Sequence, residues 1–196
     1  MNTINTEIRI FNFSSYLAYT EDILNGNVVD PVYENPLKLE ATKLNLHRMN
    51  RIYKHVKLNP ELLAKVSSAN KRRQLTIITE PWCGDAAQFV PVVARLVSES
   101  KGKLSLKLIL RDENPDIMDQ HLTNGSRSIP KLLVSWEDEP EEILWTWGPR
   151  PAFLQKYVQK AIREGLEADR RNQNVQKLYA KDKQISMQAE LLRKLQ

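Results

Sequence analysis

The sequence predicts an α/β protein whose central part runs in the order β-α-β-α-β-β-α, with helical segments before and after it. Two observations predict this class. Short apolar runs, typical of buried strands, alternate with segments whose apolar residues recur at helical spacing. The last two apolar runs are separated only by the acidic turn 137–140, which predicts an antiparallel hairpin. We therefore divide the chain into a helical N-terminal extension (1–70), a central domain (71–166) and a C-terminal amphipathic helix (167–196).

The N-terminal extension is rich in polar residues and is predicted to be helical. Its apolar residues recur near helical spacing at Leu37, Leu44, Met49, Ile52 and Val56. Pro36 suits the first turn of that helix, and Asn59 is the N-cap candidate of a short helix over 61–69. This pattern predicts a long and a short helix ahead of the first strand.

The central domain is predicted element by element from apolar periodicity and from Gly, Pro and Asn at the boundaries. Strands are expected at Leu75–Thr79, Leu104–Leu110, Lys131–Ser135 and Glu142–Thr146. Helices are expected over Gly84–Ser98, from Asn114 toward Leu122, and from Gly148-Pro149 to Leu166. The helix between the first two strands implies a right-handed crossover, so these strands are parallel. The first strand lies inside the sheet, because Ile77 and Ile78 need neighbours on both sides.

The C-terminal segment 167–196 is charged and contains neither Gly nor Pro. Its apolar positions recur at steps of three and four residues for two heptads at most, fewer than the roughly three or four that indicate a coiled coil. We therefore expect one long helix that lies on its own domain, and a dimer seam is the less favoured alternative.

Composition excludes several classes of function. The net charge is only +5, from 29 Lys and Arg against 24 Asp and Glu, and acidic residues interrupt the basic clusters. This mixture disfavours a nucleic-acid surface. The apolar runs are far shorter than the roughly 20 residues of a membrane span, and residues 1–7 show no secretory signal. The three histidines lack ligand spacing, so we expect no metal and no cofactor.

Cys83 is the single cysteine and lies in the segment Pro81-Trp82-Cys83-Gly84-Asp85-Ala86, directly after the first strand. One cysteine forms no internal disulfide, which predicts a cytoplasmic protein. The free N–H groups at a helix start favour a thiolate, so we expect an exposed thiol with a lowered pKa. The charge of Asp85 lies close enough to oppose this effect.

Four landmarks follow one another at characteristic spacing. Trp82-Cys83-Gly84 follows the first strand, and Pro91 lies eight residues after Cys83. Ile129-Pro130 precedes the third strand, and Trp147-Gly148 follows the last one. With these landmarks, residues 60–166 resemble the thioredoxin superfamily. The resemblance implies a thioredoxin-like fold and a cis Ile129–Pro130 peptide beside Cys83.

The wider segments Glu80–Gln88 and Leu110–Asn114 are similar to a bacterial thioredoxin-like family with a single active-site cysteine. Ala86 stands where a second cysteine resolves a mixed disulfide in thioredoxins. Ile77 stands where many thioredoxins carry a buried acid. Both differences remove the same step, release by the second thiol, so a dithiol cycle is disfavoured.

The resemblance also places a substrate groove around the cysteine. Cys83 is the candidate nucleophile, or else a relic thiol. The candidate groove residues are Trp82, Gly84, Asp85, Ala86, Arg127, Ile129 and Pro130. Trp82 gates the thiol or covers the helix start, and the Ile129 backbone pairs with an extended substrate strand. Arg127 either holds an anionic thiol partner or is an exposed loop arginine.

Two functions remain open. In the first, the protein is a monothiol thiol–disulfide oxidoreductase: Cys83 forms a mixed disulfide with a protein or low-molecular-weight thiol, and an external thiol resolves it. In the second, the protein is a non-enzymatic adaptor whose groove binds a peptide or protein partner. The pKa of Cys83 separates them, because a value below about 7 favours the enzyme and a value near 8.5 favours the adaptor.

Overall fold

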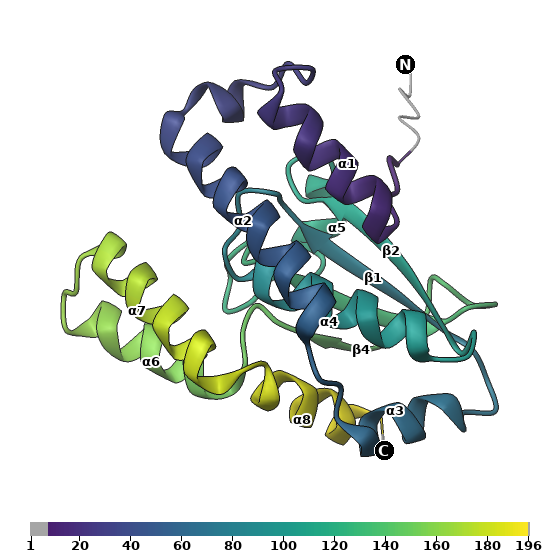
Figure 1. Cartoon of the computed structure of the whole chain (residues 1–196). Helices are drawn as coiled ribbons and strands as arrows, with labels where there is room; N and C mark the ends of the chain where they lie inside the picture. Colours follow the sequence, from purple (N-terminus) through teal and green to yellow (C-terminus); the bar gives the residue numbers. More distant parts are fainter. Residues whose placement is uncertain (1–7, 196) are drawn as a thin grey trace.

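The computed structural model describes residues 8–195, which contain a four-stranded mixed sheet in the order β2-β1-β3-β4 (Figure 1). The strands are β1 (Arg73–Thr79), β2 (Leu104–Leu110), β3 (Lys131–Trp136) and β4 (Ile143–Trp147). β1 pairs in parallel with β2 and antiparallel with β3, and β4 pairs antiparallel with β3. The expected α/β class is confirmed, with β1 inside the sheet and parallel to β2. Residues 1–7, in which no secretory signal was expected, lie outside the described residues.

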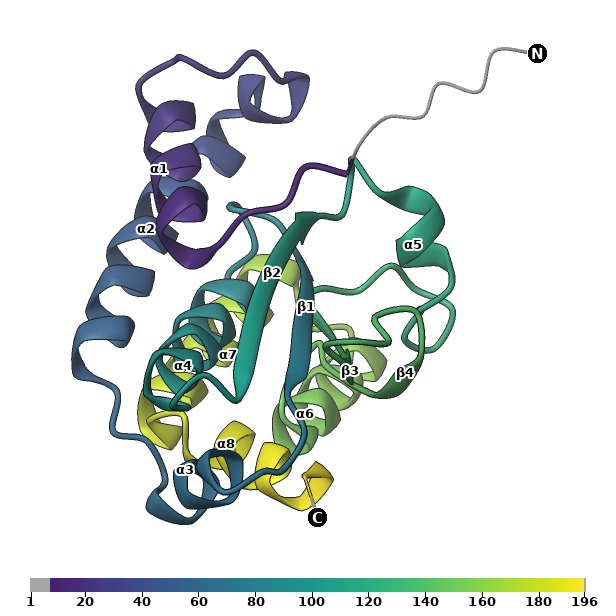
Figure 2. The ribbon, with the colours of Figure 1, turned by 90° about the vertical axis from the view of Figure 1, so that its right-hand side faces the viewer.

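Three helices belong to the central domain: α4 (Ala86–Glu99), α5 (Pro115–Asp119) and α6 (Ala152–Arg163). Figure 2 shows α4 beside β2, with α2 further out. Because α4 is covered on more than one side, it buries apolar residues over most of its length. Its Phe89 ring stacks on Trp147 at the end of β4, with the ring centroids 4.1 Å apart. This contact joins the start of α4 to the far strand of the sheet.

The described part of the N-terminal extension, residues 8–70, forms three α-helices and one short 3-10 helix. They are α1 (Phe13–Leu24), η1 (Pro31–Glu34), α2 (Pro36–His55) and α3 (Pro60–Ser67). The side chain of Asn59 accepts backbone N–H groups at the start of α3, so the predicted N-cap is confirmed. Within α2, Met49 and Ile52 are buried against the domain, whereas Leu37 and Leu44 are 76% and 56% exposed. The helix therefore presents a second, partly apolar face outward.

The C-terminal segment is helical as expected, but it forms two helices instead of one long one. They are α7 (Ala168–Asp182) and α8 (Ile185–Lys194). Lys183 and Gln184, between them, adopt left-handed backbone angles with φ of 50° and 62°. The turn lets α7 pack on α6 while α8 packs on α3, where Gln188 accepts a hydrogen bond from the Asn59 N–H. Tertiary packing thus interrupts the helix within a segment that contains no Gly or Pro, the residues that would have indicated a helix end in the sequence.

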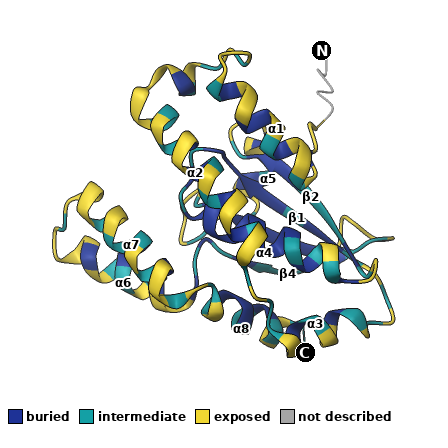
Figure 3. Ribbon diagram, viewed as in Figure 1, coloured by how far each residue is buried: buried dark blue, intermediate teal, exposed yellow. Residues whose placement is uncertain are grey.

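Burial is concentrated on the sheet and on α4, and the outer sides of α1, α2 and α7 carry most of the exposed residues (Figure 3). Within residues 8–195, every helix is too short or too polar to cross a membrane.

Candidate functional site

Cys83 lies in the loop that connects β1 to α4. Its N–H donates to the Glu80 carbonyl at 3.0 Å, and its own carbonyl accepts the Ala87 N–H at 3.1 Å. These two bonds form a tight turn that connects the buried strand β1 to helix α4. The cysteine therefore stands immediately before the first turn of α4, as its sequence position predicts.

The thiol itself is not exposed, which corrects the expectation from the sequence. Cys83 is only 7% exposed. Its Sγ donates to the Ile129 carbonyl at 3.5 Å and accepts the Ala86 N–H at 3.5 Å. Burial, together with the Asp85 carboxylate, raises the pKa of Cys83 to about 12, although the helix-start N–H groups act in the opposite direction. The effect of burial on the pKa of Cys83 is therefore larger than the opposite effect of the N–H groups at the helix start.

Asp85 is also buried, in a polar cluster that the sequence did not reveal. Its Oδ2 pairs with Arg150 Nη2 at 2.7 Å, and its Oδ1 accepts the Tyr179 hydroxyl at 3.0 Å. Burial raises the pKa of Asp85, and Arg150 and Tyr179 oppose that shift. Sequence reasoning missed Arg150 and Tyr179 because they lie 65 and 94 positions beyond Asp85 and belong to no shared motif.

The loop before β3 provides the other side of the thiol's surroundings. The Ile129–Pro130 peptide is cis, and Ile129 is buried with its carbonyl on the Cys83 sulfur. Gly148 closes this loop from the end of β4: its φ is 121°, and a Cβ there would lie 2.2 Å from the Pro130 carbonyl oxygen. Only glycine fits this close approach. The clash explains why glycine follows Trp147 at the end of β4.

A cavity of about 900 Å³ opens above the cysteine. Its walls are α2, the loop 82–85, the loop 126–129 and α7, and we call it the Cys83 cleft. Of the predicted groove residues, Trp82, Gly84, Asp85, Arg127 and Ile129 line it. Ala86 and Pro130 are buried and are not among its lining residues. The α2 and α7 walls were not predicted, since they come from the two extensions.

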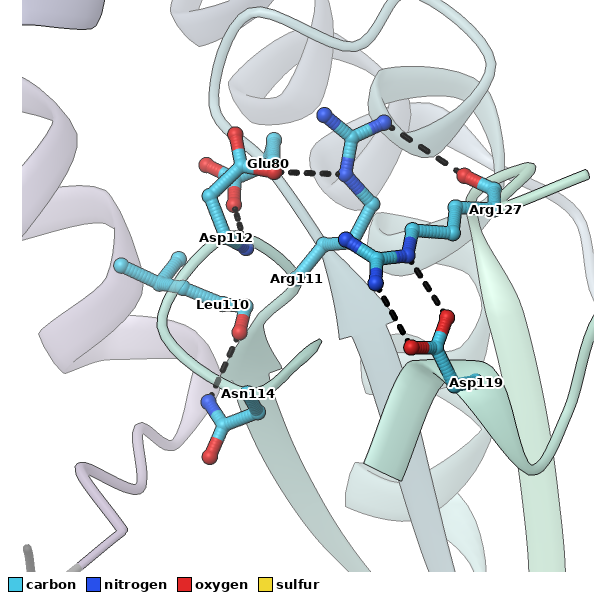
Figure 4. Close-up of polar contacts among 7 residues, drawn as sticks. All are labelled: Glu80, Leu110, Arg111, Asp112, Asn114, Asp119 and Arg127. Atoms are coloured by element: carbon cyan, nitrogen blue, oxygen red, sulfur yellow. Dashed lines mark hydrogen bonds and ion pairs between the residues drawn. The ribbon is translucent and has the colours of Figure 1, made fainter. Parts of the chain in front are cut away.

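Arg127 is held at the rim of the cleft by a carboxylate. Its Nε and Nη2 both donate to Asp119 on α5 at 2.6 Å (Figure 4). Arg111 Nη1 donates to the Arg127 carbonyl at 3.4 Å, and Arg111 Nε donates to Asp112 at 2.8 Å. Because Arg127 is already paired with Asp119, the structure favours the interpretation of Arg127 as an exposed loop arginine over that of a residue that holds an anionic thiol partner.

Glu80, at the end of β1, anchors the same cluster. Its Oε1 accepts the Asp112 N–H at 2.9 Å (Figure 4). Burial raises the pKa of Glu80 to about 7. Trp82 lies between two cations, with Lys38 Nζ 3.7 Å and Arg111 Cζ 4.9 Å from its ring centroid. Trp82 also forms part of the cleft wall.

Comparison with known proteins identifies the class of protein. A sequence profile of a family described as Thioredoxin matches residues 35–163, more than half of the chain. The chain therefore belongs to this thioredoxin family. Within residues 8–195, no group of three His, Cys, Asp or Glu side chains is placed to hold a metal ion.

Individual relatives match only part of the chain. Thioredoxin 1 of Nostoc sp. is 37% identical over 54 residues, which are 28% of this chain and 48% of that protein. Thioredoxin M5, chloroplastic, of Oryza sativa subsp. japonica is 31% identical over 81 residues, 40% of this chain and 45% of that protein. The chain thus spans less than half the length of these two relatives.

A solved structure matches nearly the whole chain. A crystal structure of a Pseudomonas aeruginosa protein of unknown function superposes with a TM-score of 0.55, at 16% identity over 94% of this chain and 90% of that one. This likeness concerns the fold and includes the helical extensions.

Proposed function

We propose that this protein is a binding member of the thioredoxin family, which holds an extended segment of a partner protein in the Cys83 cleft. The position of the Cys83 thiol supports this proposal over redox catalysis. Cys83 is only 7% exposed, its Sγ donates to the Ile129 carbonyl, and the sequence contains no second cysteine. A buried, protonated thiol with no internal partner is a poor nucleophile.

The raised pKa of Cys83 strongly lowers the reactivity of its thiol. A pKa of about 12 leaves about one thiolate in 10⁵ molecules at pH 7, against about 3% for an unperturbed cysteine. Asp85 adds to this because its carboxylate, held by Arg150 and Tyr179, stands next to the thiol. The arrangement favours keeping the proton on sulfur.

The cleft supports binding in two ways. It is large enough for a peptide, and its walls combine apolar side chains such as Leu44 and Val175 with polar ones. Ile129 lines the cleft, and its N–H donates to no acceptor among residues 8–195. An extended peptide can pair with that free backbone donor, the usual way in which a peptide adds to an exposed strand end.

Alkylation kinetics test the state of the thiol. We expect iodoacetamide to modify native Cys83 at least about 100-fold more slowly at pH 8 than the urea-unfolded chain, with the rate still rising above pH 10. A native rate equal to that of the unfolded chain would contradict the proposal. Protection of the Ile129 amide from hydrogen exchange by a bound peptide is the matching test of binding.

Monothiol thiol–disulfide exchange is the second candidate function. It is supported by the Ala86 N–H that points at Sγ and by the thioredoxin relatives. In this mechanism the Cys83 thiolate attacks one sulfur of a disulfide, the other sulfur leaves as a thiolate, and an external thiol later attacks the mixed disulfide to free Cys83.

Intact-mass analysis distinguishes the two candidates. Wild type, Cys83→Ser and Ala86→Cys are incubated with a small mixed disulfide. The binding proposal predicts no adduct on wild type in the native state. An adduct that forms rapidly on wild type, is absent from Cys83→Ser and turns into an internal disulfide in Ala86→Cys supports the monothiol enzyme instead.

A further inference from the structure

The walls of the Cys83 cleft carry an excess of positive charge. Five of its lining side chains are cationic, and one is anionic: Arg48, Arg111, Arg127, Arg150 and Lys177, against Asp85. This imbalance is local, because the whole chain carries a net charge of only +5. A concave surface with one sign of charge attracts ligands of the opposite sign.

Three of these cations already have carboxylate partners. Arg150 pairs with Asp85, Arg127 with Asp119 and Arg111 with Asp112. Within the described residues, Arg48 and Lys177 form no ion pair with a carboxylate. They come from the two extensions, Arg48 from α2 and Lys177 from α7, so the unmatched charge of the cleft belongs to its two outer walls.

Arg48 is fixed in place and partly buried. Its Nη1 donates to Asn45 Oδ1 at 2.6 Å, and the buried Asn45 donates through Nδ2 to the Pro81 carbonyl at 2.9 Å. Its Nε and Nη2 donate to no acceptor within residues 8–195. Burial, and next to it Arg51, lowers the pKa of Arg48. A desolvated guanidinium with free donors gains more from an anion than an exposed one does.

This guanidinium lies near Gly84, the residue that follows Cys83. A Cβ placed on Gly84 would lie 3.9 Å from Arg48 Nη1 and 3.0 Å from Gln176 Nε2. Arg48 and Gln176 therefore flank Gly84, the residue after Cys83. A carboxylate of the ligand, seated at this point, would meet donors from both α2 and α7.

The apolar part of the cleft indicates what carries that carboxylate. Leu44 lies one turn before Arg48 on the same wall, and Ile129 and Val175 line the other sides. Leu44 is 56% exposed, so its side chain offers apolar surface to a ligand on this wall. The cleft thus combines apolar and cationic side chains around a volume of about 900 Å³, which is large enough for several residues of a peptide.

We propose that the Cys83 cleft selects an acidic, extended peptide segment of its partner, with one acidic side chain on Arg48 beside Gly84 and another near Lys177. This inference rests on the proposed binding function and specifies its ligand. The unmatched positive charge and the adjacent apolar wall favour a peptide that carries both acidic and apolar residues.

Fluorescence anisotropy with matched peptides tests the inference. The probes are two labelled peptides of about ten residues, one alternating glutamate with valine and one with glutamine in place of glutamate. We expect the glutamate peptide to bind wild type at least about tenfold more tightly, and Arg48→Gln to remove about tenfold of that affinity. Raised salt should weaken the binding of the glutamate peptide only.

Two further variants keep the outcome clear. Lys177→Gln changes an exposed side chain and should weaken the glutamate peptide without altering thermal unfolding. Arg193→Gln, an exposed arginine of α8 that does not line the cleft, should leave the affinity unchanged. Equal binding of both peptides overturns the acidic preference while the binding function stands. If neither peptide binds wild type, the proposed function fails, and this inference fails with it.

Discussion

The hydroxyl of Tyr179 on α7 donates to the carboxylate of Asp85 at 3.0 Å, so the C-terminal extension reaches the start of α4. Both residues are buried, and the same carboxylate pairs with Arg150. Helix α7 is therefore part of the site's structure and helps to hold the Asp85 carboxylate near Cys83.

Replacing Tyr179 with phenylalanine tests this link. The change deletes one hydrogen bond to a buried carboxylate and leaves the ring in place. We expect the free energy of unfolding to fall by about 1.5–3 kcal/mol in urea denaturation. Tyr157→Phe is the matched control, because the Tyr157 hydroxyl only accepts a bond from Asn174 in a partly exposed position. Equal losses for the two variants would show that Tyr179 contributes no special support.

Asp85→Asn should make the thiol more reactive. The Asp85 carboxylate raises the pKa of Cys83, and its removal leaves the Arg150 charge to favour the thiolate. We expect the alkylation rate at pH 8 to rise by about tenfold, which corresponds to a pKa lower by about one unit. Asp119→Asn, which removes the surface partner of Arg127, is the control and should not change the rate. An unchanged rate in Asp85→Asn would refute this electrostatic account.

Glu80 should make stability depend on pH between about 4.5 and 7. Burial raises its pKa from 4.5 to about 7, so the folded state binds its proton more tightly than the unfolded state does. The stabilisation is complete below the unfolded pKa and is lost as the pH rises through the folded pKa. Wild type should lose about 3 kcal/mol more than Glu80→Gln between pH 4.5 and 8.

Glutamine is a suitable replacement because its side-chain oxygen can still accept the Asp112 N–H. The measurement is urea unfolding of both proteins across this pH range. Parallel stability curves for wild type and Glu80→Gln would show that Glu80 is ionised in the folded state throughout.

Gly148→Ala should be strongly destabilising. The new Cβ would lie 2.2 Å from the Pro130 carbonyl oxygen, at a backbone φ of 121°. We expect a loss of about 3 kcal/mol or more, because both the clash and the backbone angle are unfavourable. Gly102→Ala isolates the second effect: its φ is 75°, and nothing lies within 4 Å of the new Cβ. That variant should lose only about 1 kcal/mol in the same denaturation assay.

The sheet and the cysteine position followed from the sequence because they depend on local pattern. Ile77 and Ile78 are both fully buried, as a continuous apolar run in an inner strand requires. The N-cap at Asn59 and the turn before α4 likewise depend on residues within a few positions of one another. Such features need no knowledge of distant contacts.

The chemistry at Cys83 was decided by tertiary structure. A helix start favours a thiolate, but the actual pKa depends on how much water and which charges remain around the sulfur. The Ile129 carbonyl contacts the sulfur, and the charge that acts on it comes from Asp85, which is itself held by Arg150 and Tyr179 from distant segments. The same applies to Arg48 and Lys177, whose charges meet only because both extensions fold over the cleft. Desolvation is a property of the whole packed structure, and no local motif in the sequence encodes it.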